Sequence, residues 1–139
     1  MNDDNFCEVV YDNFFMNSKK DIIFLEGLET RCVIGIFDWE RRVKQKVRID
    51  LEIPIDARYA ARHDRIENAI NYKVIAKRLL KEIGKSRFNL VESLAEFIAR
   101  FCLKEFNLRE IKVRVAKPGA IRGAQNVGVQ ITRKNRERS

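Results

Sequence analysis

The feature that most constrains the fold is a strict alternation of apolar and polar residues between positions 47 and 55. Every second residue in this stretch is aliphatic: Val47, Ile49, Leu51, Ile53 and Ile55. In an extended chain, a period of two places successive side chains on opposite faces. The pattern therefore predicts a β-strand with one buried face and one wet face, and Pro54 places the end of this strand at a sheet edge.

Three further stretches also predict strands. Residues 22–36 are rich in β-forming side chains, and Gly27 and Gly35 interrupt them, which favours a strand that is bent at glycine. Aliphatic residues alternate again in residues 111–115 and 127–131. The sequence thus predicts one strand pair near each end of the chain.

Two amphipathic helices are predicted between these strand pairs. One begins at Tyr72, where Asn71 can cap it and Gly84 can end it, and the other begins after Asn89. The order β-β-α-α-β-β is an α+β layout with an antiparallel sheet. Because four strands leave two open edges, we expect self-association that pairs edges or closes a barrel.

The chain has 139 residues, of which 45% are hydrophobic, and this suits a single globular domain. We assign residues 21–133 to the domain, residues 1–20 to a disordered leader and residues 134–139 to a basic disordered tail. No apolar run approaches the roughly 20 residues of a membrane span, and the acidic N-terminus is unlike a signal peptide. With three widely spaced cysteines, these features predict a cytoplasmic protein. The single histidine argues against a zinc site.

Lys117 is the first candidate for chemistry. It continues the alternation of Ile111, Val113 and Val115, so a regular strand would turn its ammonium toward the apolar face. A lysine held in a cleft can act as a proton carrier. The competing interpretation is that the strand frays at Ala116 and that Lys117 reaches water.

Three other residues have both a structural and a functional interpretation. Glu92, three residues after Asn89, fits a capping box, but its carboxylate could instead accept two parallel N–H bonds from an amino-pyrimidinone. Tyr72 fits the apolar stripe of its helix, and a phenol at a helix start can also relay a proton. Glu40 precedes a basic run and could be a solvated loop acid.

The balance of charge is basic, with 28 Lys and Arg against 20 Asp and Glu and a net charge of +8. This invites a role in binding nucleic acid. The basic residues are scattered, however, and no helix-turn-helix or RNA-binding aromatic motif accompanies them. We therefore favour a solvated surface and expect neither a nucleic-acid nor a membrane partner.

Five motifs occur together in an informative order: IGIFDWE (residues 34–40), NY (71–72), FNLVE (88–92), AKPGA (116–120) and NVGV (126–129). In this order and spacing the chain resembles the bacterial dihydroneopterin aldolases. The resemblance covers about residues 21–133. It implies the tunnelling fold, in which subunits close into a ring barrel and two rings stack into an octamer, with active sites between neighbouring subunits.

The resemblance also implies a reaction and roles for residues. The reaction is a retro-aldol cleavage of 7,8-dihydroneopterin in folate synthesis, without metal, cofactor or Schiff base. Lys117 would be the general acid and base, and Tyr72 would assist proton transfer and bind the pterin edge. Glu92, with the backbone of Val91, would anchor the pterin. Glu40 would lie at the side-chain end of the site.

Three alternatives stay open. The first is epimerisation at the 2′ carbon, as a second activity of the same site or as the main activity of a paralogue that acts on dihydroneopterin triphosphate. Such a paralogue would need cations at the mouth of the site, and Arg41, Arg42 and Lys44 could supply them. The second is a non-catalytic basic module that binds nucleic acid, and the third is an inert structural oligomer.

Overall fold

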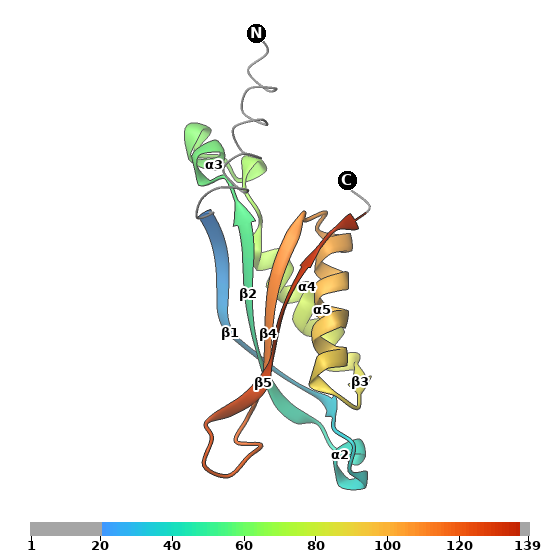
Figure 1. Ribbon diagram of the computed structural model, residues 1–139. Helices are drawn as coiled ribbons and strands as arrows, with labels where there is room; N and C mark the ends of the chain where they lie inside the picture. The colour runs from blue at the N-terminus through green and yellow to red at the C-terminus, as the bar shows by residue number, and fades with distance from the viewer. Residues whose placement is uncertain (1–20, 137–139) are drawn as a thin grey trace. The chain divides into compact units, whose positions relative to one another are not determined.

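The computed structural model of the chain describes residues 21–136, which form an α+β fold with a five-stranded sheet (Figure 1). The strands are β1 (Asp21–Ile34), β2 (Gln45–Ile55), β3 (Arg87–Phe88), β4 (Glu110–Pro118) and β5 (Asn126–Lys134). The helices are α2 (Asp38–Arg42), α3 (Ala57–His63), the 3-10 helix η1 (Ile66–Asn68), α4 (Tyr72–Lys85) and α5 (Val91–Glu105). The sheet order is β3-β1-β2-β4-β5, and β4 is antiparallel to both of its neighbours.

The described residues divide into two compact units. The smaller unit contains residues 21–23 and 54–70, and its helix α3 begins after Asp56, whose side chain accepts the N–H groups of Arg58 and Tyr59. The larger unit contains residues 24–53 and 71–136, and every candidate site residue belongs to it. In neither unit does the described part of the chain contain a helix long and apolar enough to cross a membrane.

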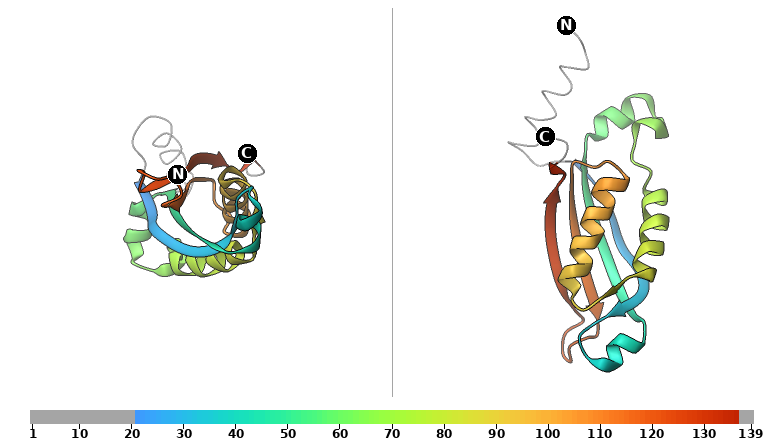
Figure 2. Two further views of the ribbon diagram at one scale, coloured as in Figure 1. Left: turned by 90° about the horizontal axis from the view of Figure 1, so that it is seen from below. Right: turned by 90° about the vertical axis from the view of Figure 1, so that its right-hand side faces the viewer.

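The core of the larger unit lies between the sheet and helices α4 and α5, which cover the same face (Figure 2). The predicted alternation is confirmed over most of β2, where four aliphatic residues are at most 1% exposed: Val47, Ile49, Leu51 and Ile53. Ile55, at the end of the strand, is only half-buried. Opposite them, α4 buries Ile75, Leu79 and Ile83, and α5 buries Leu94, Ile98 and Cys102. Each such side chain contributes about 1.5–3 kcal/mol when it leaves water.

The two long helices begin and end partly as predicted. The Asn71 side chain accepts the Val74 N–H at 3.3 Å and caps α4, as expected. The prediction that Gly84 ends α4 is wrong, because the helix continues to Lys85. Ser86 ends it instead, since both its N–H and its hydroxyl donate to the Ile83 carbonyl, at 2.9 and 2.6 Å. A hydroxyl that satisfies the last turn removes the need for a left-handed glycine.

Two further features differ from the predicted layout. The two-residue strand β3 was not predicted, and it pairs in parallel with the end of β1. The predicted start of the disordered tail, residue 134, is too early, because β5 includes Lys134 and the side chain of Asn135 is hydrogen-bonded. The Asn135 side chain donates to the carbonyls of Leu103 and Leu108, at 3.3 and 3.2 Å. The predicted leader, residues 1–20, and residues 137–139 lie outside the described residues.

Candidate active site

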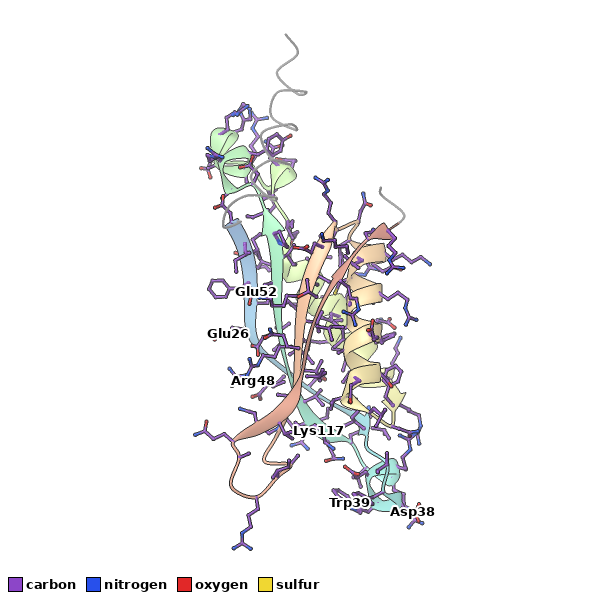
Figure 3. All side chains as sticks on the ribbon, in the orientation of Figure 1. Glu26, Asp38, Trp39, Arg48, Glu52 and Lys117 are labelled. Atoms are coloured by element: carbon purple, nitrogen blue, oxygen red, sulfur yellow. The ribbon has the colours of Figure 1, made fainter. Side chains whose placement is uncertain are left out.

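Lys117 and Glu40 form a buried ion pair at one end of the sheet. Lys117 Nζ lies 2.9 Å from Glu40 Oε2, and the two side chains are 15% and 8% exposed. Because β4 continues to Pro118, it does not fray at Ala116, and Lys117 keeps the inward phase set by Val113 and Val115. Figure 3 shows Lys117 at the end of the sheet nearest to α2. Of the two interpretations of Lys117, the structure supports the inward orientation and not the frayed strand.

Glu40 is not a solvated loop acid, because it is 6% exposed and both of its carboxylate oxygens are bound. Oε1 accepts the Phe37 N–H at 3.2 Å, and Oε2 accepts Gln45 Nε2 at 3.1 Å in addition to Lys117. The hydrogen bond from Lys117 is the main cause that lowers the pKa of Glu40, from 4.5 to about 2, and the donors Gln45 and Phe37 act in the same direction. Burial opposes this shift but does not reverse it. The carboxylate is therefore an anion at neutral pH.

The backbone at Gly35 makes room for this carboxylate. Gly35 has φ +135°, a conformation that side chains rarely adopt, and a Cβ built on it would overlap the Glu40 carboxylate. The turn after β1 can therefore bring α2 close only because residue 35 is a glycine. The sequence indicated a bend here but not its cause.

Gln45 is a site residue that the sequence analysis missed. Its Nε2 donates both to Glu40 Oε2 and to the Ile34 carbonyl, at 3.1 and 2.7 Å. Two fixed acceptors leave the amide little freedom, so it holds the carboxylate that faces Lys117. The only sequence signal is a polar but uncharged residue within the basic run of residues 41–46.

The first turn of α5 presents Val91 and Glu92 close to the same end of β1. The Gly35 N–H donates to the Phe88 carbonyl at 3.1 Å, three residues before Val91. The helix is capped at Leu90 without a side-chain hydrogen bond, so Asn89 is not its cap and Glu92 is its second residue. The capping-box interpretation of Glu92 is therefore wrong, and its exposed carboxylate is available to a ligand.

Tyr72 lies far from these residues within one chain. It opens α4, a helix of 14 residues whose last turn leads into β3. At 1.5 Å per residue the helix is about 20 Å long, so Tyr72 begins roughly that distance from the strand that meets Gly35. The ring is 53% exposed and is not a core aromatic. The structure thus brings Lys117 and Glu40 together and leaves Tyr72 at the opposite end of α4.

Comparisons with known proteins identify the family of the chain. The family model described as FolB, dihydroneopterin aldolase, matches residues 23–132. The dihydroneopterin aldolase of Escherichia coli is 39% identical over 115 residues, which are 83% of this chain and 94% of that protein. The chain belongs to the dihydroneopterin aldolase family. A further relative, the dihydroneopterin triphosphate 2′-epimerase of Pseudomonas aeruginosa, is 33% identical over 78% of this chain and 89% of that protein.

Solved structures of dihydroneopterin aldolases have the same fold. That of Vibrio cholerae matches with a TM-score of 0.81 and 38% identity, and it covers 84% of this chain and 99% of its own. The E. coli dihydroneopterin aldolase in complex with neopterin matches with a TM-score of 0.77 and 39% identity, over 81% of this chain and 98% of its own. The predicted tunnelling fold of the subunit is confirmed by these neighbours.

Proposed function

We propose that the protein is a lyase that cleaves 7,8-dihydroneopterin into 6-hydroxymethyl-7,8-dihydropterin and glycolaldehyde, a step of folate synthesis. The observation that carries the proposal is the buried 2.9 Å contact between Lys117 Nζ and Glu40 Oε2, in a chain of the dihydroneopterin aldolase family. The carboxylate holds the amine in place, and an amine fixed in this way can donate and accept the protons that a retro-aldol cleavage moves.

We assign the general acid and base role to Lys117. In the cleavage, the bond between C1′ and C2′ of the substrate side chain breaks, and the C2′ hydroxyl loses its proton as glycolaldehyde forms. The electron pair of that bond moves into the pterin ring, where Lys117 protonates the adjacent ring nitrogen. A proton then reaches C1′ and the ring nitrogen gives up its own, which completes the hydroxymethyl product. Because the pterin ring accepts the electrons, the reaction needs no Schiff base on the lysine.

Glu40 has a different task in this scheme. Its low pKa, about 2, keeps it charged throughout the reaction, so it is a poor proton carrier at neutral pH. A fixed anion beside Lys117 can instead orient the substrate hydroxyl groups, or a water molecule that relays their proton. Gln45 and the Phe37 N–H support this role, since they hold the two carboxylate oxygens in place.

We propose that Glu92 and the backbone of Val91 anchor the amino-pyrimidinone end of the pterin. A carboxylate can accept two parallel N–H bonds from that edge in a planar arrangement. Support comes from the position of Glu92 in the first turn of α5, where it is exposed and takes no part in a capping box. Binding of this kind serves the ground state and the transition state alike.

We propose that Tyr72 acts in the site of a neighbouring subunit, where it binds the pterin edge and assists proton transfer. Two features support shared sites: Tyr72 begins roughly 20 Å from the Gly35 region of its own chain, and β5 is an edge strand of the sheet that can pair with another chain. A ring of subunits would bring Tyr72 to the site of a neighbouring chain and would pair the edge strand β5. We therefore propose an octamer of two stacked rings.

Subunit mixing tests the shared site. Lys117→Ala and Tyr72→Phe should each be nearly inactive alone. If the two chains are unfolded, mixed in equal amounts and refolded, about a quarter of the sites should combine an intact lysine with an intact tyrosine. Recovery of activity on that scale supports a shared site. Mixed assemblies without any recovery would show that both residues act within one chain.

Cleavage itself is tested by incubating the purified protein with 7,8-dihydroneopterin and separating the products by chromatography. We expect 6-hydroxymethyl-7,8-dihydropterin to accumulate with the wild type and to be lost with Lys117→Ala. Equal turnover by the variant would overturn the role of Lys117. If the wild type releases no product, the proposed cleavage is wrong.

Epimerisation is the second candidate, because a relative at 33% identity is a dihydroneopterin triphosphate 2′-epimerase. The same site can perform it if the cleaved pair recombines before glycolaldehyde leaves. The structure does not favour the triphosphate as main substrate, since two of the three cations named for it are bound to backbone carbonyls. Arg41 Nη1 lies 2.8 Å from the Phe88 carbonyl, and Lys44 Nζ lies 2.9 Å from that of Gly84. Comparing turnover of both substrates decides between them.

We also propose the cytoplasm as the compartment of the protein. Its two cysteines among the described residues, Cys32 and Cys102, are buried and free, and burial raises the pKa of both thiols. Free thiols of this kind are usual in a reducing compartment.

A further inference from the structure

Arg41 joins two segments that carry different parts of the candidate site. It follows Glu40 on α2, and its Nη1 donates to the carbonyl of Phe88 at 2.8 Å and to that of Gly35 at 3.4 Å. The Phe88 carbonyl also accepts the Gly35 N–H at 3.1 Å. One guanidinium nitrogen therefore links the end of β1 to the end of β3.

A second arginine, Arg87 on β3, binds the backbone of α2. Arg87 Nη2 donates to the Arg41 carbonyl at 3.2 Å, so each arginine binds the backbone of the segment that carries the other. Both side chains line a hollow of about 550 Å³, together with Ile36, Phe88, Asn89, Leu90 and Ser93. Its lining thus includes residues of α2, of β3 and of the first turn of α5, and the two arginines connect α2 to β3.

These bridges lie between the two functions of the proposed site. On one side, Gly35 contacts the Glu40 carboxylate, which holds Lys117. On the other side, Phe88 is three residues before Val91, the proposed pterin anchor. The parallel pairing of β1 with β3 is only two residues long, so few other backbone bonds fix this spacing.

We propose that Arg41 is a positioning residue that sets the spacing between the acid–base pair and the pterin anchor. The inference rests on the proposed function, because it assumes that a pterin spans both parts. The planar guanidinium suits the task, since it can reach two carbonyls at once where an ammonium binds as a point charge. Hydrogen bonds from a charged donor to half-buried acceptors are strong enough to change a dissociation constant about tenfold or more when lost.

Arg42 provides a matched control. It is the next residue on the same helix, it carries the same charge, and its side chain is exposed. Arg41→Gln and Arg42→Gln remove the same charge within one turn of α2, but only the first removes the bridge. Arg41→Lys keeps the charge and can reach one carbonyl.

The test measures the dissociation constant of neopterin for the assembled protein, from the fluorescence of the pterin. We expect Arg41→Gln to raise it about tenfold, Arg42→Gln to leave it unchanged within about twofold, and Arg41→Lys to recover part of the loss. A purely structural role would lower the Tm of Arg41→Gln without changing neopterin affinity, and that result would overturn the proposal. Equal losses in both glutamine variants would overturn it too, because they would indicate a charge effect.

Three further outcomes are separated by the same measurements. If Arg41→Gln does not fold, Arg41→Lys compared with Arg42→Lys decides, and equal affinities would overturn the proposal. If the wild type itself does not bind neopterin, the proposed function fails and the role of Arg41 fails with it. If the wild type binds and Arg41→Gln binds equally well, only the role of Arg41 is wrong.

Discussion

Replacing Glu40 by glutamine should remove a large part of the acid sensitivity of the folded protein. In the wild type, hydrogen bonds from Lys117, Gln45 and the Phe37 N–H keep the pKa of Glu40 near 2, against an ordinary value of 4.5. The folded protein therefore binds fewer protons at this site than the unfolded chain does at every pH between these two values. Acid consequently favours unfolding.

The size of the effect follows from the difference between the two pKa values. It corresponds to about 3 kcal/mol of folding free energy from Glu40 ionisation above about pH 5. Of this, about 2 kcal/mol should be lost by pH 3, and the remainder between about pH 3 and pH 1. Glu40 is only 6% exposed and the Lys117 side chain 15%, so solvent screens the pair little.

The assay is urea denaturation of the wild type and Glu40→Gln from pH 7 to pH 3, at one fixed protein concentration, because the stability of the proposed oligomer would depend on it. The variant should be less stable at pH 7, since it leaves the Lys117 ammonium without its partner. This difference should shrink by about 2 kcal/mol at pH 3. Glu26→Gln, which removes an exposed carboxyl on β1, serves as the control. A difference between wild type and Glu40→Gln that is the same at both pH values would refute the reasoning.

Three other substitutions separate the parts of the site, and a fourth serves as a control. Lys117→Ala should lower turnover at least about a hundredfold, with a smaller change in neopterin affinity measured by fluorescence. Glu92→Ala should show the reverse pattern, raising the neopterin dissociation constant about tenfold or more while turnover at saturation falls less. Gly35→Ala should lower the free energy of unfolding by about 2–4 kcal/mol, because its methyl group meets the Glu40 carboxylate in a strained backbone conformation. Gly84→Ala, where the nearest atom would lie at an ordinary 3.9 Å, should be neutral or stabilising in the same denaturation assay.

The parts of the fold that could be predicted are those set by residues close together in sequence. The alternation of β2 and the helical spacing of α4 each identify a buried face, and both faces are buried in the structure. The orientation of Lys117 follows from the same rule, since its phase is inherited from Val113 and Val115. Local patterns failed at the ends of elements: Ser86 and not Gly84 ends α4, and Leu90 and not Asn89 precedes α5.

The site could be predicted less completely, because its contacts join residues far apart in sequence. Glu40 and Lys117 are separated by 77 positions, and nothing in the run that contains Glu40 distinguishes it from a solvated acid. Its burial depends on Gly35, on Gln45 and on the lysine together. Strand β3 could not be predicted for the same reason. Two residues are too few to show an alternating pattern, and they form a strand only because the end of β1 lies beside them.

The position of Tyr72 gives the strongest physical argument that one chain does not hold a whole site. Its motif matched the family as well as that of Lys117 did, yet a helix about 20 Å long separates it from the strand that meets Gly35. Helix α4 is packed against the sheet through buried Ile75, Leu79 and Ile83, so moving its first turn to Lys117 would require exposing that core. If Tyr72 and Lys117 serve one reaction, a second chain can supply the tyrosine without exposing this core. Symmetric pairing of the sheet edge at β5 would repeat that contact in every subunit.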